Sequence, residues 1–100
     1  MNVTYRVDKD ILYIAIEGRI DASNAAEAEE KIFSIKNDNL GKHTVVDADK
    51  LEYISSAGLR VILQAQKTMN KQGEMIIKNV NETINEIFEV TGFIDILTIE

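Results

Sequence analysis

Two hydrophobic periodicities alternate along this chain, and their alternation constrains the fold more than any other feature. Short apolar runs with the period of two that is typical of strands are followed by segments with helical spacing. The runs at 3–7 and 11–17 flank a polar turn at 8–10, which predicts an N-terminal β-hairpin. Further strands are expected at 44–48, 75–78 and 94–99.

Helical spacing predicts about three major helices between these strands. The first begins after Asn24, which with Glu27 three residues later forms a capping-box pattern. The other two are expected from about position 55 to Gly73 and from 81 to 91. The resulting order, ββαβαβαβ, predicts a single α/β domain over residues 1–100, with a mixed, partly parallel sheet and right-handed crossovers.

The size and charge of the chain argue against several classes of protein. Its 100 residues include no Cys, so there is neither a thiol nucleophile nor a disulfide framework. The formal charge of -6 argues against direct nucleic-acid binding, which depends on clustered Lys and Arg. No apolar run approaches the roughly 18 residues needed to span a membrane, and we expect a soluble, cytoplasmic protein without membrane insertion.

A pair of serines stands where a polar turn becomes a helix with an apolar stripe. Ser55 and Ser56 precede Leu59, Ile62 and Leu63, which recur at helical spacing. The first amides of a helix have no partner within the helix and carry partial positive charge, so they attract anions. Either serine could be a plain N-cap, or the pair could hold a phosphate in one state of a switch.

Parallel strands also predict where a site would lie. Ligands of such sheets usually meet the loops at the carboxyl ends of the strands. By this rule Asp21, Asp47, Asp49 and the serine pair should share one edge of the domain. Asp21 follows a strand directly, and we keep two roles open for it: local hydrogen bonding in a turn, or partner binding.

The segment from Leu51 to Leu63 resembles the signature of STAS domains, the anti-sigma factor antagonists of bacteria. In that family a short apolar stretch leads into Asp-Ser-(Ser/Thr/Ala)-Gly-Leu. Upstream, 12–21 is similar to the family's second strand, which ends in Gly-x-(Leu/Ile/Phe)-Asp, and downstream 87–93 resembles its closing helix and turn. The three blocks follow the family's order and spacing over nearly the whole chain.

The resemblance implies a function by partner exchange, without an enzymatic activity or a cofactor. In the family, the Ser after the motif's Asp is phosphorylated by a partner that is both an anti-sigma factor and a serine kinase, and a serine phosphatase reverses this. That residue corresponds to Ser56, with Ser55 as the alternative acceptor. The implied partner-binding residues are Asp21, Ser55, Ser56, Ala57, Gly58, Leu59 and Arg60.

The chain departs from the family pattern at two positions. Ser55 replaces the Asp before the acceptor, and Arg60 stands where the family often has a small residue. An arginine there can pair with a phosphate or occupy space where a partner would approach. These departures keep a second function open, that of a non-phosphorylated STAS scaffold or accessory subunit in a transporter-associated or stress-sensing assembly.

An enzyme is the third hypothesis, and the residues argue against it. Asp47 and Asp49 form an Asp-x-Asp pattern at a strand end, as in magnesium-dependent phosphatases, but no second acidic cluster follows. The single His, His43, precedes a strand whose far end leads toward Ser56, so about 17–20 Å would separate them. We therefore expect no catalytic residue and no metal site.

Overall fold

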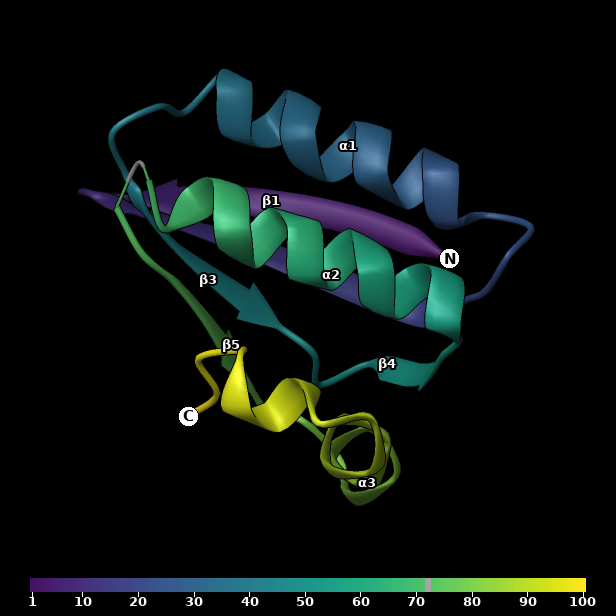
Figure 1. Cartoon of the computed structure of the whole chain (residues 1–100). Helices are drawn as coiled ribbons and strands as arrows, with labels where there is room; N and C mark the ends of the chain where they lie inside the picture. The colour runs from purple at the N-terminus through teal and green to yellow at the C-terminus, as the bar shows by residue number, and fades with distance from the viewer. Residues whose placement is uncertain (72) are drawn as a thin grey trace.

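The computed structural model describes residues 1–71 and 73–100 (Figure 1). The strands are β1 (Asn2–Asp8), β2 (Ile11–Ile20), β3 (His43–Asp47), β4 (Leu51–Ile54) and β5 (Met75–Lys78). The helices are α1 (Ala25–Asn37), α2 (Ser56–Met69) and α3 (Glu82–Thr91), followed by the short 3₁₀ helix η1 (Phe93–Asp95). The predicted α/β class, the N-terminal hairpin and the three helices are confirmed.

The sheet is mixed, with β2 at its centre. Its order is β1-β2-β3-β5, and β4 also pairs with β2. β1 is antiparallel to β2, whereas β3 and β4 run parallel to it. β2 pairs with β3 over 11–15 and with β4 from Gly18 onward, and the register shifts between Gly18 and Arg19. The carboxyl end of β2 therefore lies beside β4.

The core lies between one face of the sheet and the helices. Leu12, Ile14 and Ile16 alternate along β2 and are almost completely buried, as the period of two predicts. In Figure 1, α2 lies in front of β1 and β2, and α1 runs above β1. Buried residues of both helices join the core. The longest helix among the described residues is α2, and none of these helices is long and apolar enough to cross a membrane.

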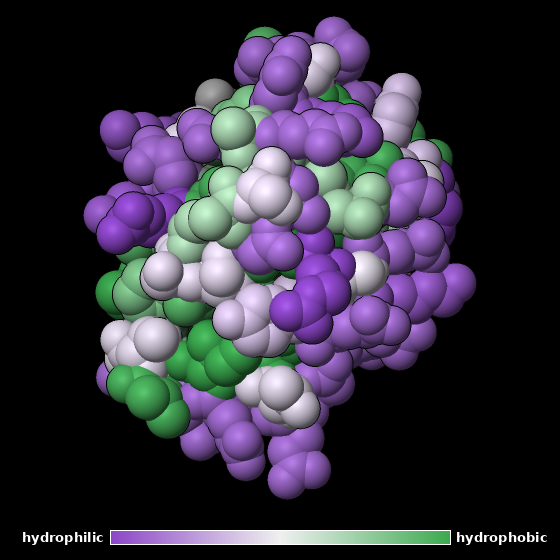
Figure 2. All heavy atoms as spheres, turned by 90° about the vertical axis from the view of Figure 1, so that its right-hand side faces the viewer, coloured by the Kyte–Doolittle hydropathy of each residue, from purple (hydrophilic) through white to green (hydrophobic). Residues whose placement is uncertain are grey.

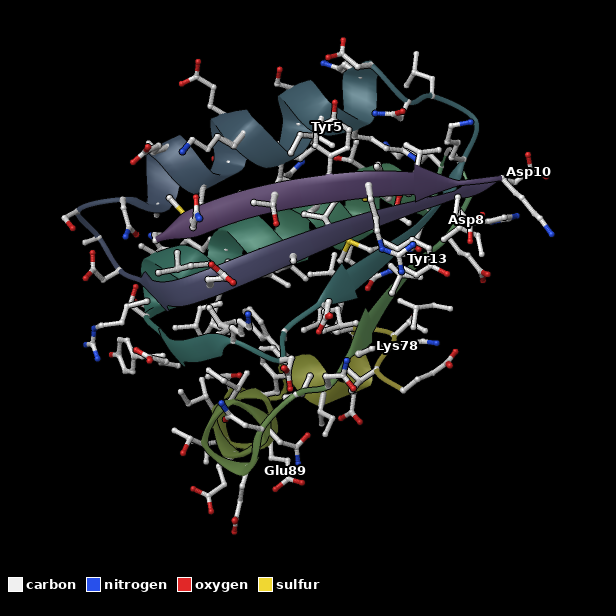
Figure 3. All side chains as sticks on the ribbon, turned by 180° about the vertical axis from the view of Figure 1, so that it is seen from behind. Tyr5, Asp8, Asp10, Tyr13, Lys78 and Glu89 are labelled. Carbon is white, nitrogen blue, oxygen red and sulfur yellow. The ribbon has the colours of Figure 1, made fainter. Side chains whose placement is uncertain are left out.

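The opposite face of β1, β2 and β3 is open, since no helix of the described residues lies over it (Figure 3). Tyr13 projects from β2 on this side, and the guanidinium of Arg6 lies 3.9 Å from the centre of its ring. This face is polar enough to remain in water, as in many sheets that contain an antiparallel pair.

The predicted order ββαβαβαβ is wrong in two places, and the observed order is ββαββαβα. The residues just before the serine pair form the additional strand β4, which we had taken as a polar turn and the approach to a helix. The final strand predicted at 94–99 is absent: η1 occupies 93–95, and Ile99 makes only an isolated bridge to Ile77. Gly92, with φ 79°, ends α3 in the left-handed conformation and turns the chain away.

Candidate functional site

Ser55 joins the end of the sheet to the start of α2. Its backbone N–H donates to the carbonyl of Ile20, the last residue of β2, at 2.8 Å. Its Oγ accepts a hydrogen bond from the backbone N–H of Gly58 at 3.4 Å, and its carbonyl accepts one from Leu59 at 2.8 Å. Ser55 is therefore the N-cap of α2, with the extended backbone that such caps adopt.

Ser56 is the first residue of α2, and its side chain is exposed. Within residues 1–71 and 73–100 its hydroxyl takes part in no hydrogen bond, unlike that of Ser55. The first-turn amides of α2 carry partial positive charge beside it. The Ser56 hydroxyl is thus available both to a partner and to a modifying enzyme.

Gly58 lets the first turn of α2 lie directly on the sheet. A Cβ atom at this position would stand 2.7 Å from Ile20 Cγ2 and 2.7 Å from Ile54 Cγ1. Leu59, the next residue, is also buried. Among the predicted partner-binding residues, Gly58 and Leu59 are therefore packing residues, while Ser56, Ala57 and Arg60 reach the surface.

A shallow groove between α1 and α2 adjoins Ser56. It is lined by small side chains and a few charged or polar ones, namely Ala22, Ala25, Ala26, Glu29, Ala57, Arg60, Val61 and Gln64. Figure 2 faces this end of the molecule, where pale and light-green spheres run across the centre beside a strongly hydrophilic margin. A surface of small side chains lets the backbone of a partner approach closely.

Asp21 is at the surface beside the helix start, but its carboxylate is engaged within its own loop. Oδ1 accepts hydrogen bonds from the backbone N–H of Ser23 at 2.9 Å and from the Ser23 hydroxyl at 2.5 Å. The Ser23 hydroxyl, before any other group, lowers the pKa of Asp21 below its ordinary value of 3.8. This geometry supports the turn role that we had kept open beside partner binding.

The capping box predicted at Asn24 and Glu27 is wrong. Asn24 is the N-cap residue of α1, but its side chain makes no cap hydrogen bond. Its Oδ1 accepts from the backbone N–H of Asp21 at 2.9 Å, and its Nδ2 donates to the carbonyl of Arg19 at 2.9 Å. Asn24 therefore ties the loop before α1 to the end of β2.

Asp47 does not share the edge formed by Asp21 and the serine pair, which corrects the prediction. It ends β3 level with Ala15 of β2, six residues before Asp21, or about 20 Å along an extended strand. Its Oδ1 accepts from Asp49 N at 2.9 Å and from Asn79 Nδ2 at 3.0 Å. Asp47 therefore stabilises the turn toward β4, and Asp49 is exposed in that turn.

His43 is at the opposite end of β3 from Asp47. It is exposed, and its Nδ1 is 4.0 Å from Glu74 Oε1. Among the described residues no group of three or more His, Asp or Glu side chains is arranged to hold a metal ion.

Sequence reasoning missed a cation–aromatic pair at this end of the sheet. Arg19 of β2 and Tyr53 of β4 are partners in register, and the guanidinium lies 4.4 Å from the centre of the ring. Arg19 lies inside the segment that resembles the family's second strand, but only the pairing of β2 with β4 reveals its neighbour. Tyr53 was hidden because β4 itself was not predicted.

The fold and this site define a small α/β domain whose distinctive surface is the start of one helix, with a free hydroxyl and a groove beside it. A family model described as "STAS domain" matches residues 2–100. The chain belongs to the STAS domain family and, by distant homology, to its anti-sigma factor antagonists, which are non-enzymatic regulators.

Relatives of known description support this placement. "Putative anti-sigma factor antagonist BtrV" of Bordetella bronchiseptica is 31% identical over 100 residues, covering 99% of this chain and 85% of the relative. An "Anti-sigma-B factor antagonist" of Listeria monocytogenes is 28% identical over 106 residues, covering 100% of this chain and 90% of the relative. The family assignment thus extends over almost the full length of both chains.

Solved structures show the same fold. An anti-sigma factor antagonist from Mycobacterium paratuberculosis has a TM-score of 0.86 at 16% identity, covering 98% of this chain and 83% of its own. The anti-sigma factor antagonist SpoIIAA in its unphosphorylated form has a TM-score of 0.77 at 16% identity, covering 99% and 88%. At this level of identity the likeness concerns the fold alone.

Proposed function

We propose that this chain binds an anti-sigma factor serine kinase and is switched by phosphorylation of Ser56, so controlling the release of a sigma factor. The observation that carries the proposal is the exposed hydroxyl of Ser56 at the first position of α2, which makes no hydrogen bond to any other described residue. The groove of small side chains beside it supplies a surface on which a partner can dock.

The two serines differ in a way that favours Ser56 as the acceptor. The Ser55 oxygen already accepts the hydrogen bond that caps α2, and Ser55 is half-buried. Transfer of a phosphate to Ser55 would first break that contact, whereas transfer to Ser56 breaks none. Ser55 remains the alternative acceptor, because it is only one residue away.

Phosphorylation would add a charge of about -1.5 to -2 at this surface. Within the chain, the first amides of α2 and the exposed guanidinium of Arg60, four residues on, favour that charge. A partner that had packed against a neutral hydroxyl must instead dehydrate a dianion or move away. The modified chain therefore stays folded while its complex dissociates, and a serine phosphatase would restore binding.

A non-phosphorylated scaffold or accessory subunit is the second candidate function. The observation that favours it is Ser55 at the position where the family's motif carries Asp. In that case the groove between α1 and α2 would bind a subunit of a transporter or stress-sensing assembly permanently, and Ser56 would be only a surface residue of the helix start.

The test of phosphorylation is a kinase assay with matched variants. The chain, Ser55→Ala and Ser56→Ala are each incubated with ATP and the anti-sigma factor kinase captured from the source organism, and peptides are mapped by mass spectrometry. We expect one phosphate, mostly on Ser56, and its loss in Ser56→Ala only. Phosphate confined to Ser55, or capture of transporter subunits without any kinase, would refute the Ser56 switch.

The switch also predicts different partner affinities for Ser56→Ala and Ser56→Asp. Alanine removes a hydroxyl that makes no hydrogen bond among the described residues, whereas aspartate places an unpaired carboxylate in the interface. We expect Asp to bind the kinase at least about tenfold more weakly than Ala, on the order of 1.4 kcal/mol, by titration calorimetry. Equal kinase affinities of Ser56→Ala and Ser56→Asp would mean that Ser56 has only a structural role.

A further inference from the structure

β1 is a long sheet edge, and no strand in the described part of the chain pairs with its outer side. It pairs with β2 on one side only, from Asn2 opposite Glu17 to Asp8 opposite Ile11, without a shift of register. Proteins usually blunt such an edge with a short strand, charged side chains, a Pro or a bulge. β1 has seven residues, no Pro and no bulge, and its charged residues are Arg6 and Asp8.

The opposite edge strand of the sheet, β5, has hydrogen-bond partners on its outer side. Ile77 of β5 donates its N–H to the carbonyl of Thr98 at 2.8 Å and accepts a hydrogen bond from the N–H of Glu100 at 2.9 Å. The C-terminal segment thus covers the middle of β5. β4, the remaining strand with an open side, is only four residues long.

The hairpin determines which backbone groups of β1 are open. A hairpin with a two-residue loop closes on a pair that exchanges both hydrogen bonds, here Asp8 and Ile11. Because bonding alternates along an antiparallel pair, Val3, Tyr5 and Val7 direct their N–H and C=O groups away from β2. None of these groups has a backbone partner elsewhere in residues 1–71 and 73–100.

Two of these three side chains are also exposed, whereas Val3 is half-buried against the core. Tyr5 is 53% exposed and Val7 43% exposed, although both lie on the face that α1 shares. Val3 and Tyr5 line a groove under α1 together with Lys31, Ile35 and the acids beside them. Figure 3 shows Tyr5 between β1 and α1.

We infer that β1 pairs with β1 of a second copy of this chain, antiparallel, across a two-fold axis at Tyr5. In this register Val3 faces Val7, Tyr5 faces Tyr5, and about six hydrogen bonds form from the open groups. Aromatic and β-branched cross-strand pairs of this kind stabilise sheets. On the other face Arg6 meets Thr4, so no like charges stand directly opposite each other.

The neighbouring registers are less favourable. Centring the axis on Arg6 places the two guanidinium groups opposite each other, which destabilises a sheet. Centring it on Thr4 pairs only residues 2–6 of the two strands and leaves Val7 and Asp8 without a partner in β1 of the second copy. The Tyr5 register alone uses all seven residues of β1 in both copies.

Charge on α1 is compatible with the same axis. Glu27, Glu30 and Lys31 line the groove above the β1 edge, and the axis brings an antiparallel α1 toward it. Lys31 pairs with Glu27 of its own helix at 3.1 Å, so one of the two acids of this groove already has a cationic partner in each copy. An interface of one strand per copy is small, so the dimer should form in a concentration-dependent equilibrium.

Cysteine cross-linking tests the register, because the chain has no Cys of its own. Paired residues on the axis have Cα atoms about 5.5 Å apart, within the range of a disulfide. Tyr5→Cys should therefore form an oxidised dimer at least about tenfold faster than Asn2→Cys or the exposed control Leu40→Cys. Val3→Cys and Val7→Cys should cross-link when mixed and not separately.

Sedimentation equilibrium of the unmodified chain tests the association itself. The average mass of the chain should rise toward that of a dimer as its concentration increases. Tyr5→Pro removes an outward N–H group that the second copy would need but that an edge strand does not need for its own fold. This variant should therefore stay monomeric. Circular dichroism should be used to check that this variant folds. A wild-type chain that is monomeric at about 1 mM, equal cross-linking rates for Tyr5→Cys and Leu40→Cys, or an edge that binds only extended peptides of other proteins would overturn the inference.

Discussion

At the scale of single residues, two adjacent serines have different roles. Ser55 caps α2 through its Oγ, and Ser56 offers a free hydroxyl. The hydrophobic pattern could not distinguish them, because both stand directly before an apolar helical stripe; only the resemblance to STAS domains pointed to Ser56 as the acceptor. The distinction depends on the extended backbone of Ser55, which its hydrogen bond to Ile20 fixes across 35 positions of the chain.

This division of roles predicts that alanine substitutions at the two serines differ in their effect on stability. Ser55→Ala removes the N-cap and should lower the free energy of unfolding by about 0.5–2 kcal/mol. Ser56→Ala should change it by less than about 0.5 kcal/mol, because that hydroxyl is exposed and makes no cap bond. Urea denaturation measures both. A larger loss of unfolding free energy for Ser56→Ala than for Ser55→Ala would show that Ser56, and not Ser55, caps α2.

Asp21 gives a pH-dependent prediction at the same scale. The hydrogen bonds from Ser23 lower the pKa of Asp21 in the folded chain, whereas the unfolded chain keeps a value near 3.8. Ionised Asp21 therefore stabilises the fold above that pH, and the contribution is lost as the pH falls through the folded pKa. In an NMR titration, Ser23→Ala should raise the Asp21 midpoint, and an unchanged midpoint would contradict this assignment.

At the scale of elements, α2 depends on its close contact with the sheet. Gly58→Ala adds a Cβ that overlaps Ile20 and Ile54 at 2.7 Å. Alanine favours a helix by up to about 1 kcal/mol, but overpacking of this kind costs about 1–3 kcal/mol, so we expect net destabilisation in a thermal or urea melt. The cost should shrink in an Ile54→Ala background, and an unchanged cost there would place the strain elsewhere.

The elements also show what sequence patterns can and cannot reveal. Leu12, Ile14 and Ile16 predicted β2 correctly, because a strand with one buried face needs that alternation. β4 was missed because its four residues show no such pattern, and it pairs with β2 only beyond the irregularity at Gly18. Local periodicity reports burial, whereas the partner of a strand is a long-range property.

At the scale of the whole molecule, the register of the sheet decides which predicted site residues meet. β2 pairs with β3 as far as Ala15 and with β4 from Gly18 onward. The serine pair, which follows β4, therefore lies near Asp21, whereas Asp47, at the end of β3, lies farther back along β2. The general rule for strand ends predicted one edge for all of them, but it assumes strands of equal length. The place of the serine pair at a helix start singled it out in advance, and the resemblance to STAS domains pointed to Ser56 as the acceptor.

The same register separates the two proposed surfaces. Ser55 bonds to Ile20, whereas Tyr5 pairs with Ile14, six residues earlier and about 20 Å along β2. Partner binding at α2 and pairing of β1 should therefore be additive. We expect Ser56→Asp to weaken kinase binding without changing the sedimentation mass, and Tyr5→Pro to do the reverse. In the double variant, the loss of kinase affinity and the loss of dimer mass should each equal the loss measured in the single variant, because neither change alters a contact of the other.

A Tyr5→Pro chain that folds yet binds the kinase more than about threefold more weakly would mean that the partner also contacts the β1 edge.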